Sequence, residues 1–536
     1  MQEGVLVGAL REVKKFLERE GQYRERPFLD YAVGEIDRAA AESEGTTFFV
    51  SAPTGYGKTA ISMATALKEL RRGYKAIIAY PLRALVEEQR EKFCRMFAGR
   101  HGPVVGVRMM GVSESQYLVH PVVLTTVDTL SLTAVGLSPE DVSTMLRYEN
   151  ALGHYLFSWG SVWLSSIVLD EVHLLCDSTK SLSFLAAMLK VSSYVFGNSL
   201  IVMSATMPRA YVDALRSFSY RPVTLSFAPD MDPRFVEERM GKKYRVNVLE
   251  LPPDEKFERI EELLKQSRFT RALVVFNTVE EAQRFYSRLS FERKLLVHSR
   301  YSPEDRERKI GELKTIQREG GVIVATQVIE AGVNISSDLI VTDAAPASTL
   351  VQRFGRFLRF EKEQCADPER CAYVWFSPEE LQGDRYKVYD AGLTKETLSY
   401  IEKNPDVNLH VGYEEMLNSV YRQEHARVDP HYVGEVFNIF AHLSRASKPA
   451  LDLLLRSEGS LVRESSLFCA ETLDGVKFNA DYNFIEKHCV PGECPKNLRE
   501  ALLRAIEAER ATFRVRCTYS TELGVTCSQG GAAESS

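Results

Sequence analysis

The chain has 536 residues, of which 45% are hydrophobic and 26% charged, and it carries a formal net charge of −6. This composition is typical of a soluble globular protein with two or three domains, and no apolar run approaches the ~18 residues of a membrane span. It argues against an integral membrane protein, predicts no membrane partner and favours a cytoplasmic location. Because the chain as a whole is acidic, any surface that binds nucleic acid must be local.

Short apolar runs alternate with helical patterns along most of the chain. In the first half, the predicted strands are 46–50, 76–80, 122–126, 166–170 and 200–205. In the second half, they are 272–277, 295–298, 321–326, 339–343 and 372–376. Runs rich in Val, Ile and Leu are typical of strands buried on both faces of a parallel sheet. The alternation therefore predicts α/β architecture twice over.

The same pattern divides the chain into two similar halves and a mostly helical C-terminal region. The expected boundaries are 1–230 for the first domain with its helical lead-in, 244–400 for the second, and 401–536 for the accessory region. The polar, proline-punctuated segment 228–243 is the expected link between the halves. In the last region a helix is predicted at 497–510, and the small, polar tail 528–536 is expected to be disordered.

A glycine-rich stretch, SAPTGYGKT at 51–59, lies between the first predicted strand and a predicted helix. That context is typical of a phosphate-binding loop, in which Gly55 and Gly57 let backbone N–H groups turn toward the phosphates. Lys58 would bring a charge to the β- and γ-phosphates and Thr59 a hydroxyl to Mg²⁺. A simple glycine-rich turn is the alternative, since the second residue is Ala where the strict pattern has Gly. The predicted nucleotide-binding residues, for the cofactors ATP and Mg²⁺, are Ala52, Pro53, Thr54, Gly55, Tyr56, Gly57, Lys58 and Thr59.

The predicted strand 166–170 ends in two carboxylates, Asp170 and Glu171. At such a strand end, Asp170 can hold Mg²⁺ and Glu171 can polarise the attacking water. A bare Asp-Glu pair is also common as a helix cap. The pair lies 112 residues after Lys58 (170 minus 58) and follows a buried-looking strand, which favours the catalytic interpretation.

A basic stretch at 68–108 holds ten Lys and Arg against four Glu. A solvated helix face explains much of this excess of positive charge. The stretch is also a plausible part of a groove for nucleic-acid phosphates, which need no base-specific contact.

Six segments, in chain order, resemble the motifs of the superfamily 2 helicases. They are 80–89 (motif Ia), 125–129 (Ib), 170–173 (II), 204–206 (III), 325–335 (V) and 352–359 (VI). The resemblance covers roughly residues 24–376. It implies two tandem RecA-like parallel-sheet domains with ATP between the two sheets.

The resemblance also implies a role for each candidate residue. The catalytic set is Lys58, Glu171, Arg356 and Arg359, and Gly332 joins the nucleotide-binding residues. The predicted nucleic-acid contacts are Arg83, Thr126, Ser299, Arg300 and Thr326. The predicted coupling residues are His173, Ser204, Thr206 and Gln352. The spacing 353, 356, 359 places three arginines on one helical face, where Arg356 and Arg359 would stabilise charge on the γ-phosphate. Surface ion pairs are the alternative.

Within the superfamily, three passages resemble the CRISPR-associated Cas-three helicases of type I systems. They read LDEVHLL at 169–175, LVHSR at 296–300 followed by Asp305-Arg306, and ATQVIE at 325–330. The resemblance implies movement 3′ to 5′ on single-stranded DNA during CRISPR interference. The departures are a missing Gln upstream of the phosphate loop at 26–30, Asn334 in place of a common Asp, and Phe357-Leu358 where many helicases have Gly.

Many such helicases carry a metal-dependent nuclease domain with a His-Asp signature. None of the ten histidines here is followed by Asp, and about fifty residues precede the phosphate loop, too few for a domain of usual size. We therefore expect this chain to unwind but not cut. The expected partners are single-stranded DNA, a separate HD-type nuclease subunit and a CRISPR RNA-guided surveillance complex. An RNA or repair helicase of the same superfamily and an ATP-gated nucleic-acid clamp remain as alternatives.

The nine cysteines are odd in number and scattered, which argues against a disulfide framework and for a reducing compartment. Cys365 and Cys371 flank a loop and are expected to be free thiols. The remaining candidates for zinc ligands are His488, Cys489, Cys494, Cys517 and Cys527. Their spacings are not a common ligand pattern, so the sequence favours no metal there and leaves the question open.

Overall fold

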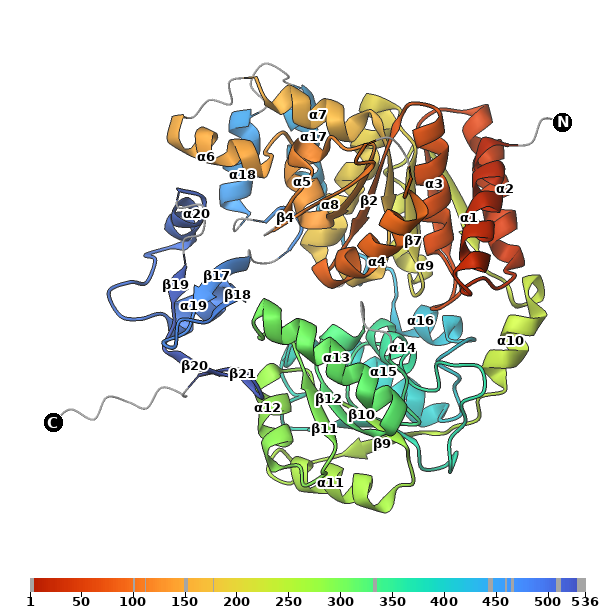
Figure 1. Ribbon diagram of the computed structural model, residues 1–536, viewed down its shortest axis with the longest axis vertical. Coiled ribbons are helices and arrows are strands. Elements are labelled where there is room, and N and C mark those ends of the chain that lie inside the picture. Colours follow the sequence, from red (N-terminus) through yellow and green to blue (C-terminus); the bar gives the residue numbers. More distant parts are fainter. Residues whose placement is uncertain are drawn as a thin grey trace. The chain divides into compact units, whose positions relative to one another are not determined.

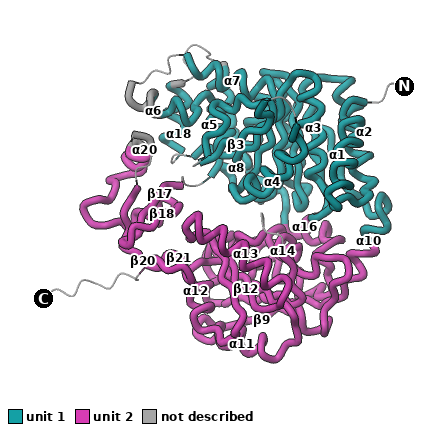
Figure 2. The backbone as a smooth tube through the Cα atoms, viewed as in Figure 1, with its two compact units in different colours: residues 1–236, 421–464 teal, residues 237–420, 465–536 magenta. Residues whose placement is uncertain are grey.

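The chain forms two compact units (Figure 2). Unit 1 comprises residues 1–236 and 421–464, and unit 2 comprises residues 237–420 and 465–536. The computed structural model describes residues 4–99, 102–110, 112–148, 153–176, 178–330, 335–441, 447–457, 460–463, 467–507 and 512–527. The region expected as one accessory domain, 401–536, is thus divided between the two units.

Unit 1 is built on one sheet. Its strands are β1 Thr46–Ser51, β2 Lys75–Tyr80, β3 Val105–Met109, β4 Val112–Ser113, β5 Val122–Thr126, β6 Ser165–Leu169, β7 Leu200–Ser204 and β8 Arg221–Ser226. Their order is β4-β3-β5-β2-β6-β7-β1-β8. All neighbours run parallel except β3 and β4. Every residue of β5 and β7 is buried, as their unbroken apolar runs predict.

Helices cover this sheet (Figure 1). They are α1 Val5–Arg19, α2 Pro27–Glu42, α3 Thr59–Arg71, α4 Arg83–Met96, α5 Val127–Ala134, α6 Pro139–Tyr148, α7 Tyr155–Trp163, α8 Thr179–Val191, α9 Arg209–Arg216, α17 Pro430–Ala441 and α18 Ser447–Arg456. Helix α1 packs on α2 and α3, and α17 packs on α8. Phe440 of α17 contacts Trp159, Trp163 and Phe196, with ring centroids 5.1, 5.5 and 5.9 Å away. A late segment of the chain therefore completes the core of unit 1.

Unit 2 is built on a parallel sheet in the order β11-β12-β10-β13-β14-β9. The strands are β9 Val246–Glu250, β10 Arg271–Val275, β11 Lys294–Val297, β12 Gly321–Ala325, β13 Leu339–Asp343 and β14 Ala372–Phe376. The helices are α11 Lys256–Gln266, α12 Val279–Arg288, α13 Pro303–Glu319, α14 Ala347–Phe354, α15 Ala391–Lys403 and α16 Glu414–Val420, with a small hairpin of β15 Arg385–Tyr386 and β16 Tyr389–Asp390. The α/β architecture predicted for both halves is confirmed.

The end of the chain forms a small module within unit 2, residues 467–527, called here the C-terminal module. It contains a three-stranded sheet in the order β18-β17-β19 and a separate hairpin, β20-β21. Its elements are β17 Leu467–Glu471, β18 Lys477–Asp481, α19 Tyr482–His488, α20 Leu498–Glu507, β19 Phe513–Arg514, β20 Cys517–Ser520 and β21 Gly524–Cys527. The late region is therefore less uniformly helical than the sequence indicates.

All ten predicted strands are present, each within two residues of its expected ends. In the two large sheets, the strands that were missed are β3, β4, β8 and β9, and the short strands β15 to β21 were missed as well. Three of these, β4, β8 and β9, lie at sheet edges, where partly exposed residues break the apolar pattern. The expected link at 228–243 also contains a helix, α10 Pro233–Met240, at the boundary between the units. None of the described helices is long and apolar enough to cross a membrane.

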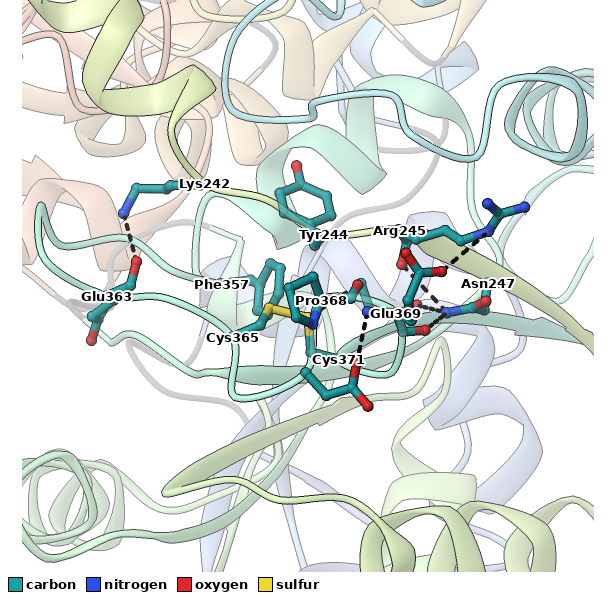
Figure 3. Close-up of a disulfide and its surroundings, with 12 residues drawn as sticks. Lys242, Tyr244, Arg245, Asn247, Phe357, Glu363, Cys365, Pro368, Glu369 and Cys371 are labelled. Carbon is teal, nitrogen blue, oxygen red and sulfur yellow. Dashed lines mark hydrogen bonds and ion pairs between the residues drawn. A yellow bond between two sulfur atoms is a disulfide. The ribbon is translucent and has the colours of Figure 1, made fainter.

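Cys365 and Cys371 were expected to be free thiols, and the cysteines as a whole were expected to form no disulfide framework. Both expectations were wrong. Disulfides join Cys365–Cys371, Cys489–Cys494 and Cys517–Cys527. Figure 3 shows the Cys365–Cys371 disulfide and the loop that contains it. Two hydrogen bonds hold this loop: the Arg245 N–H donates to the Pro368 carbonyl, and the Asn247 side-chain amide donates to the Glu369 carbonyl. The count and scatter of cysteines failed as a guide because folding, not spacing alone, decides which side chains meet.

Candidate functional site

The glycine-rich loop follows β1 and leads directly into α3. Gly55 and Gly57 have φ values of 78° and 99°, a left-handed conformation that favours glycine. The Lys58 ammonium is buried and donates to the Ala52 carbonyl at 3.1 Å. The Ala52 N–H in turn donates to the Ser204 carbonyl at 3.2 Å, which joins the loop to the end of β7. Thr59 is the first residue of α3.

Tyr56 turns its side chain into the core. Its ring is fully buried, with the rings of Phe227 and Phe235 both at 5.0 Å. Its hydroxyl donates to Asp232 at 3.0 Å and accepts from the Phe28 N–H at 3.2 Å. The Tyr56 side chain therefore anchors the loop from behind, and the predicted nucleotide contact of this residue stays a prediction. Within the loop, the Pro53 carbonyl accepts from the Tyr56 N–H, and Thr54 lies at the intervening turn.

Sequence reasoning noted a missing Gln at 26–30 and gave Arg26 no role. The Arg26 guanidinium lies 5.2 Å from the centre of the Tyr56 ring and 4.8 Å from that of Phe235. It also lies 3.7 Å from the Asp232 carboxylate. Cation–π contact and ion pairing thus hold Arg26 against the back of the phosphate loop.

The two carboxylates lie where β6 ends. Asp170 is buried, and its carboxylate accepts from the Glu171 N–H at 2.9 Å. Burial and the charge of Glu171 raise the pKa of Asp170 to about 7, and the Lys58 charge opposes this shift. A Glu171 carboxylate oxygen lies 3.9 Å from the Lys58 ammonium. The structure thus gathers Lys58, Asp170 and Glu171 at one edge of the unit 1 sheet.

The predicted coupling residues of unit 1 form a connected chain. The Glu171 carboxylate lies 3.4 Å from His173 Nδ1, which lies 3.3 Å from the Ser204 hydroxyl. The Thr206 N–H then donates to that hydroxyl at 3.2 Å. Burial lowers the pKa of His173 to about 4, so its imidazole is neutral at physiological pH. The chain connects the ends of neighbouring strands β6 and β7.

The candidate nucleic-acid contacts of unit 1 follow two other neighbouring strands. Arg83 starts α4 after β2 and pairs with Glu87 at 3.7 Å, and Thr126 caps α5 after β5 by accepting from the Thr129 N–H. Sequence reasoning missed Arg463. Its guanidinium donates to Asp128 at 2.8 Å and contacts the Pro81 carbonyl. Arg463 therefore holds together the segments of motifs Ia and Ib. No local sequence pattern around Arg463 could have revealed this role.

The candidate contacts of unit 2 follow β11 and β12. The Thr326 N–H donates to the Val297 carbonyl, and the Thr326 side chain is buried. Ser299 and Arg300 begin the loop after β11. Arg300 pairs with Glu280, and its guanidinium lies 4.6 Å from the centre of the Phe484 ring. The C-terminal module thus contacts the side chain predicted to contact nucleic acid.

The three arginines of motif VI do not share a helical face. Helix α14 ends at Phe354, before Arg356 and Arg359. The chain leaves the helix because the Leu358 N–H donates to the Ser337 carbonyl and Leu358 takes a left-handed φ of 48°. The even three-residue spacing therefore predicted a helix beyond its actual end.

Arg353 is fully buried and holds unit 2 together. It donates to the Glu330 carboxylate, the Thr342 hydroxyl and the Asn277 side chain, each at 2.8–2.9 Å. Arg356 donates to the Ile329 carbonyl at 2.7 Å and to the Glu330 carbonyl at 3.0 Å. Both arginines therefore fix the start of motif V.

The remaining candidates of unit 2 lie around these arginines. The Arg359 N–H donates to the Ser336 hydroxyl at 2.9 Å, and Gln352 is buried in α14. Gly332 lies outside the described residues.

A family model matches part of each half of the chain. A family model described as DEAD/DEAH box helicase matches residues 36–214. A second, described as CRISPR-associated nuclease/helicase Cas3, C-terminal, matches residues 268–362. Each half therefore resembles the helicase class over the part of it that a family model matches.

Within that class the chain is similar to the Cas3 helicases. It is 26% identical over 382 residues to the CRISPR-associated helicase Cas3 of Thermoproteus tenax, covering 68% of this chain and 60% of the relative. It is 30% identical over 221 residues to a putative CRISPR-associated nuclease/helicase Cas3 of Myxococcus xanthus, covering 40% of this chain and 28% of the relative. The chain therefore spans less than two thirds of the length of these relatives.

Solved structures show the same fold. The crystal structure of T. fusca Cas3-AMPPNP matches with a TM-score of 0.64 at 14% identity, over 97% of this chain and 71% of that one. The crystal structure of a CRISPR-associated protein matches with a TM-score of 0.66 at 18% identity, over 96% and 70%. A chain of a CRISPR RNA-guided surveillance complex, pre-nicking, matches with a TM-score of 0.59 at 16% identity, over 96% and 70%.

Proposed function

We propose that this chain is a nucleic-acid-dependent ATPase that moves 3′ to 5′ on single-stranded DNA and unwinds duplexes in type I CRISPR interference. The observation that carries the proposal is the group formed by Lys58, Asp170 and Glu171 at the ends of β1 and β6. One cation and two carboxylates behind a glycine-rich loop are the parts that ATP hydrolysis requires.

Two oxygen donors fit a magnesium ion in this group. The Thr59 hydroxyl at the start of α3 and the buried Asp170 carboxylate are the hard ligands that Mg²⁺ prefers. Burial and the charge of Glu171 raise the pKa of Asp170, so a cation bound there would stabilise its charged form. Bound there with ATP, Mg²⁺ would neutralise phosphate charge.

Each side chain has a separate task in this proposal. Lys58 would leave the Ala52 carbonyl for the β- and γ-phosphates, and Glu171 would orient and polarise the attacking water. Arg356 and Arg359 would stabilise the charge that develops on the γ-phosphate.

The neutral His173 supports a link between hydrolysis and the rest of unit 1. Its Nδ1 atom lies near both the Glu171 carboxylate and the Ser204 hydroxyl. A change in the position or charge of the Glu171 carboxylate during turnover would therefore alter the contacts of Ser204 and Thr206. Gln352 is proposed to play the corresponding part in unit 2.

The side chains proposed to contact the nucleic-acid strand are Arg83, Thr126, Ser299, Arg300 and Thr326. These polar and charged groups suit phosphate and sugar contacts, which fix register without reading sequence. Binding should then weaken steeply as salt rises, because each neutralised phosphate releases condensed counterions.

Cutting is proposed to reside on a separate HD-type nuclease subunit, with loading by a CRISPR RNA-guided surveillance complex. One structural neighbour is a chain of such a complex, captured before nicking. Incubating the chain with single-stranded DNA plus Mn²⁺, Ni²⁺ or Co²⁺ tests the absence of cutting. Degradation that survives Lys58→Ala would contradict this part of the proposal.

The deciding experiment compares ATPase stimulation by single-stranded DNA, duplex DNA and RNA side by side. We expect the largest stimulation with single-stranded DNA, and unwinding only of duplexes with a 3′ overhang. Greater stimulation by RNA would favour an RNA helicase. Tight ATP-dependent binding without turnover would favour an ATP-gated clamp.

A further inference from the structure

We propose that the reduced C-terminal module binds Zn²⁺ through His488, Cys517 and Cys527. Either a disulfide or a metal ion then cross-links this part of unit 2, and each such cross-link is called a staple below. A ring nitrogen of His488 and the two sulfur atoms all lie within 4.8 Å of one another. Zinc takes nitrogen at about 2.0 Å and thiolate sulfur at about 2.3 Å. The three ligand atoms therefore need only small shifts to surround one ion.

Three separate elements bring these side chains together. Cys517 and Cys527 face each other across the β20-β21 hairpin, with Cα atoms 4.2 Å apart. His488 ends α19, and its carbonyl accepts from the Arg516 N–H at 2.7 Å, next to Cys517. The next residue, Cys489, pairs with Val515 as an isolated antiparallel bridge. The site is therefore preformed by backbone pairing.

The module needs a staple because its core is small. The buried cluster holds twelve side chains, of which seven are Ala, Val or Cys. The four cysteines of the two late disulfides pack in or against it. Cores of this size rarely stabilise a fold alone, and disulfides or a structural metal commonly compensate. The chemistry that holds the module then depends on the surrounding redox state.

The disulfide and the metal site cannot form at the same time, because both use the sulfur atoms of Cys517 and Cys527. A dithiol reductant transfers two electrons and two protons to the Cys517–Cys527 bond, which gives two thiols and an oxidised dithiol. Zn²⁺ then displaces the two thiol protons and binds two thiolates and the His488 ring nitrogen. The fourth coordination position is left for water.

The staple would also steady the segment predicted to contact nucleic acid. The Leu523 carbonyl, in the turn of the same hairpin, accepts from Gln283 at 2.6 Å and from His298 Nε2 at 2.9 Å. The Val525 N–H donates to the Arg300 carbonyl at 3.0 Å. Loss of the staple should therefore loosen the loop after β11. This consequence rests on the proposed function, whereas metal binding does not.

The test measures metal on the full chain, reduced anaerobically with a phosphine and freed of unbound ions. We expect about one Zn²⁺ per reduced wild-type chain and none at this site in the oxidised chain. Co²⁺ in place of Zn²⁺ should give the thiolate charge-transfer bands of a tetrahedral site. Cys517→Ser with Cys527→Ser should abolish both signals.

Two further variants keep the test decisive. His488→Ala leaves the disulfide possible and should weaken Zn²⁺ affinity by about tenfold or more. Cys365→Ser with Cys371→Ser removes a different disulfide and should keep the full metal content. A reduced wild-type chain without zinc, or equal zinc in His488→Ala and wild type, would overturn the proposal. Neither readout depends on ATPase activity.

Discussion

Replacing Glu171 by Gln should separate ATP binding from ATP hydrolysis. Gln keeps the size of the side chain, and the left-handed backbone at this position, with φ of 54°, suits it no less than Glu. The lost attraction to Lys58 is small, because the charges are 3.9 Å apart and the Glu171 side chain is 25% exposed. The main loss is the general base, which contributes about 10²–10⁴ in rate, or about 3–5 kcal/mol of activation free energy.

We therefore expect kcat of Glu171→Gln to fall by about 10²–10⁴ while the Kd for a fluorescent ATP analogue changes little. Single-turnover hydrolysis with saturating single-stranded DNA measures the first quantity and titration the second. Glu44→Gln, an exposed carboxylate in the same unit, is the matched control, and Lys58→Ala should lose binding as well. Near wild-type turnover in Glu171→Gln would refute the role given to this carboxylate.

Four other perturbations test the rest of the site. Arg353→Met leaves the buried Glu330 carboxylate without its ion-pair partner and should lower the free energy of unfolding of unit 2 by about 3–5 kcal/mol. Unfolding should then occur at a lower urea concentration, and an unchanged midpoint would contradict the packing role. Arg356→Ala and Arg359→Ala should reduce hydrolysis far more than nucleotide binding, and wild-type turnover in both would exclude them as charge stabilisers. Arg463→Ala should weaken binding of single-stranded DNA with little change in ATP affinity, whereas Arg463→Lys should recover part of the loss; equal fluorescence-anisotropy curves would rule out a positioning role. Because the pKa of Asp170 is raised, a proton competes with Mg²⁺ for its carboxylate near neutral pH. The Mg²⁺ concentration for half-maximal ATPase activity should therefore rise as pH falls from 8 to about 6. A Mg²⁺ requirement that does not change with pH would argue against Asp170 as the ligand.

Local patterns predicted the parts of the molecule that depend on local physics. The central strands were found because residues such as Ile77 and Val123 are buried on both faces of a sheet, which requires an unbroken apolar run. The turn of the glycine-rich loop was predicted because Gly55 and Gly57 are needed for its backbone. Edge strands such as β8 were missed because one side of them faces water.

Features that depend on distant pairing could not be read from the sequence. Arg463 lies 335 residues from its partner Asp128, and nothing beside either residue marks the other. Tyr56 and Asp232 are separated by 176 residues, so the sequence did not show that the Tyr56 side chain anchors the loop. The cysteine pairs are close in sequence, yet the hairpin that aligns Cys517 with Cys527 was not predicted.

The path of the chain between the two units sets an order on folding during synthesis. Residues 421–464 return to unit 1 after the whole of 237–420 has been made, and they include Phe440, which packs on Trp159 and Trp163. A ribosome must therefore finish most of unit 2 before unit 1 can close its core, although domains usually fold in the order of their synthesis. Until then, an aromatic surface of unit 1 stays uncovered. A gene fragment ending near residue 400 would keep this surface exposed permanently, so it should aggregate even though it encodes every helicase motif.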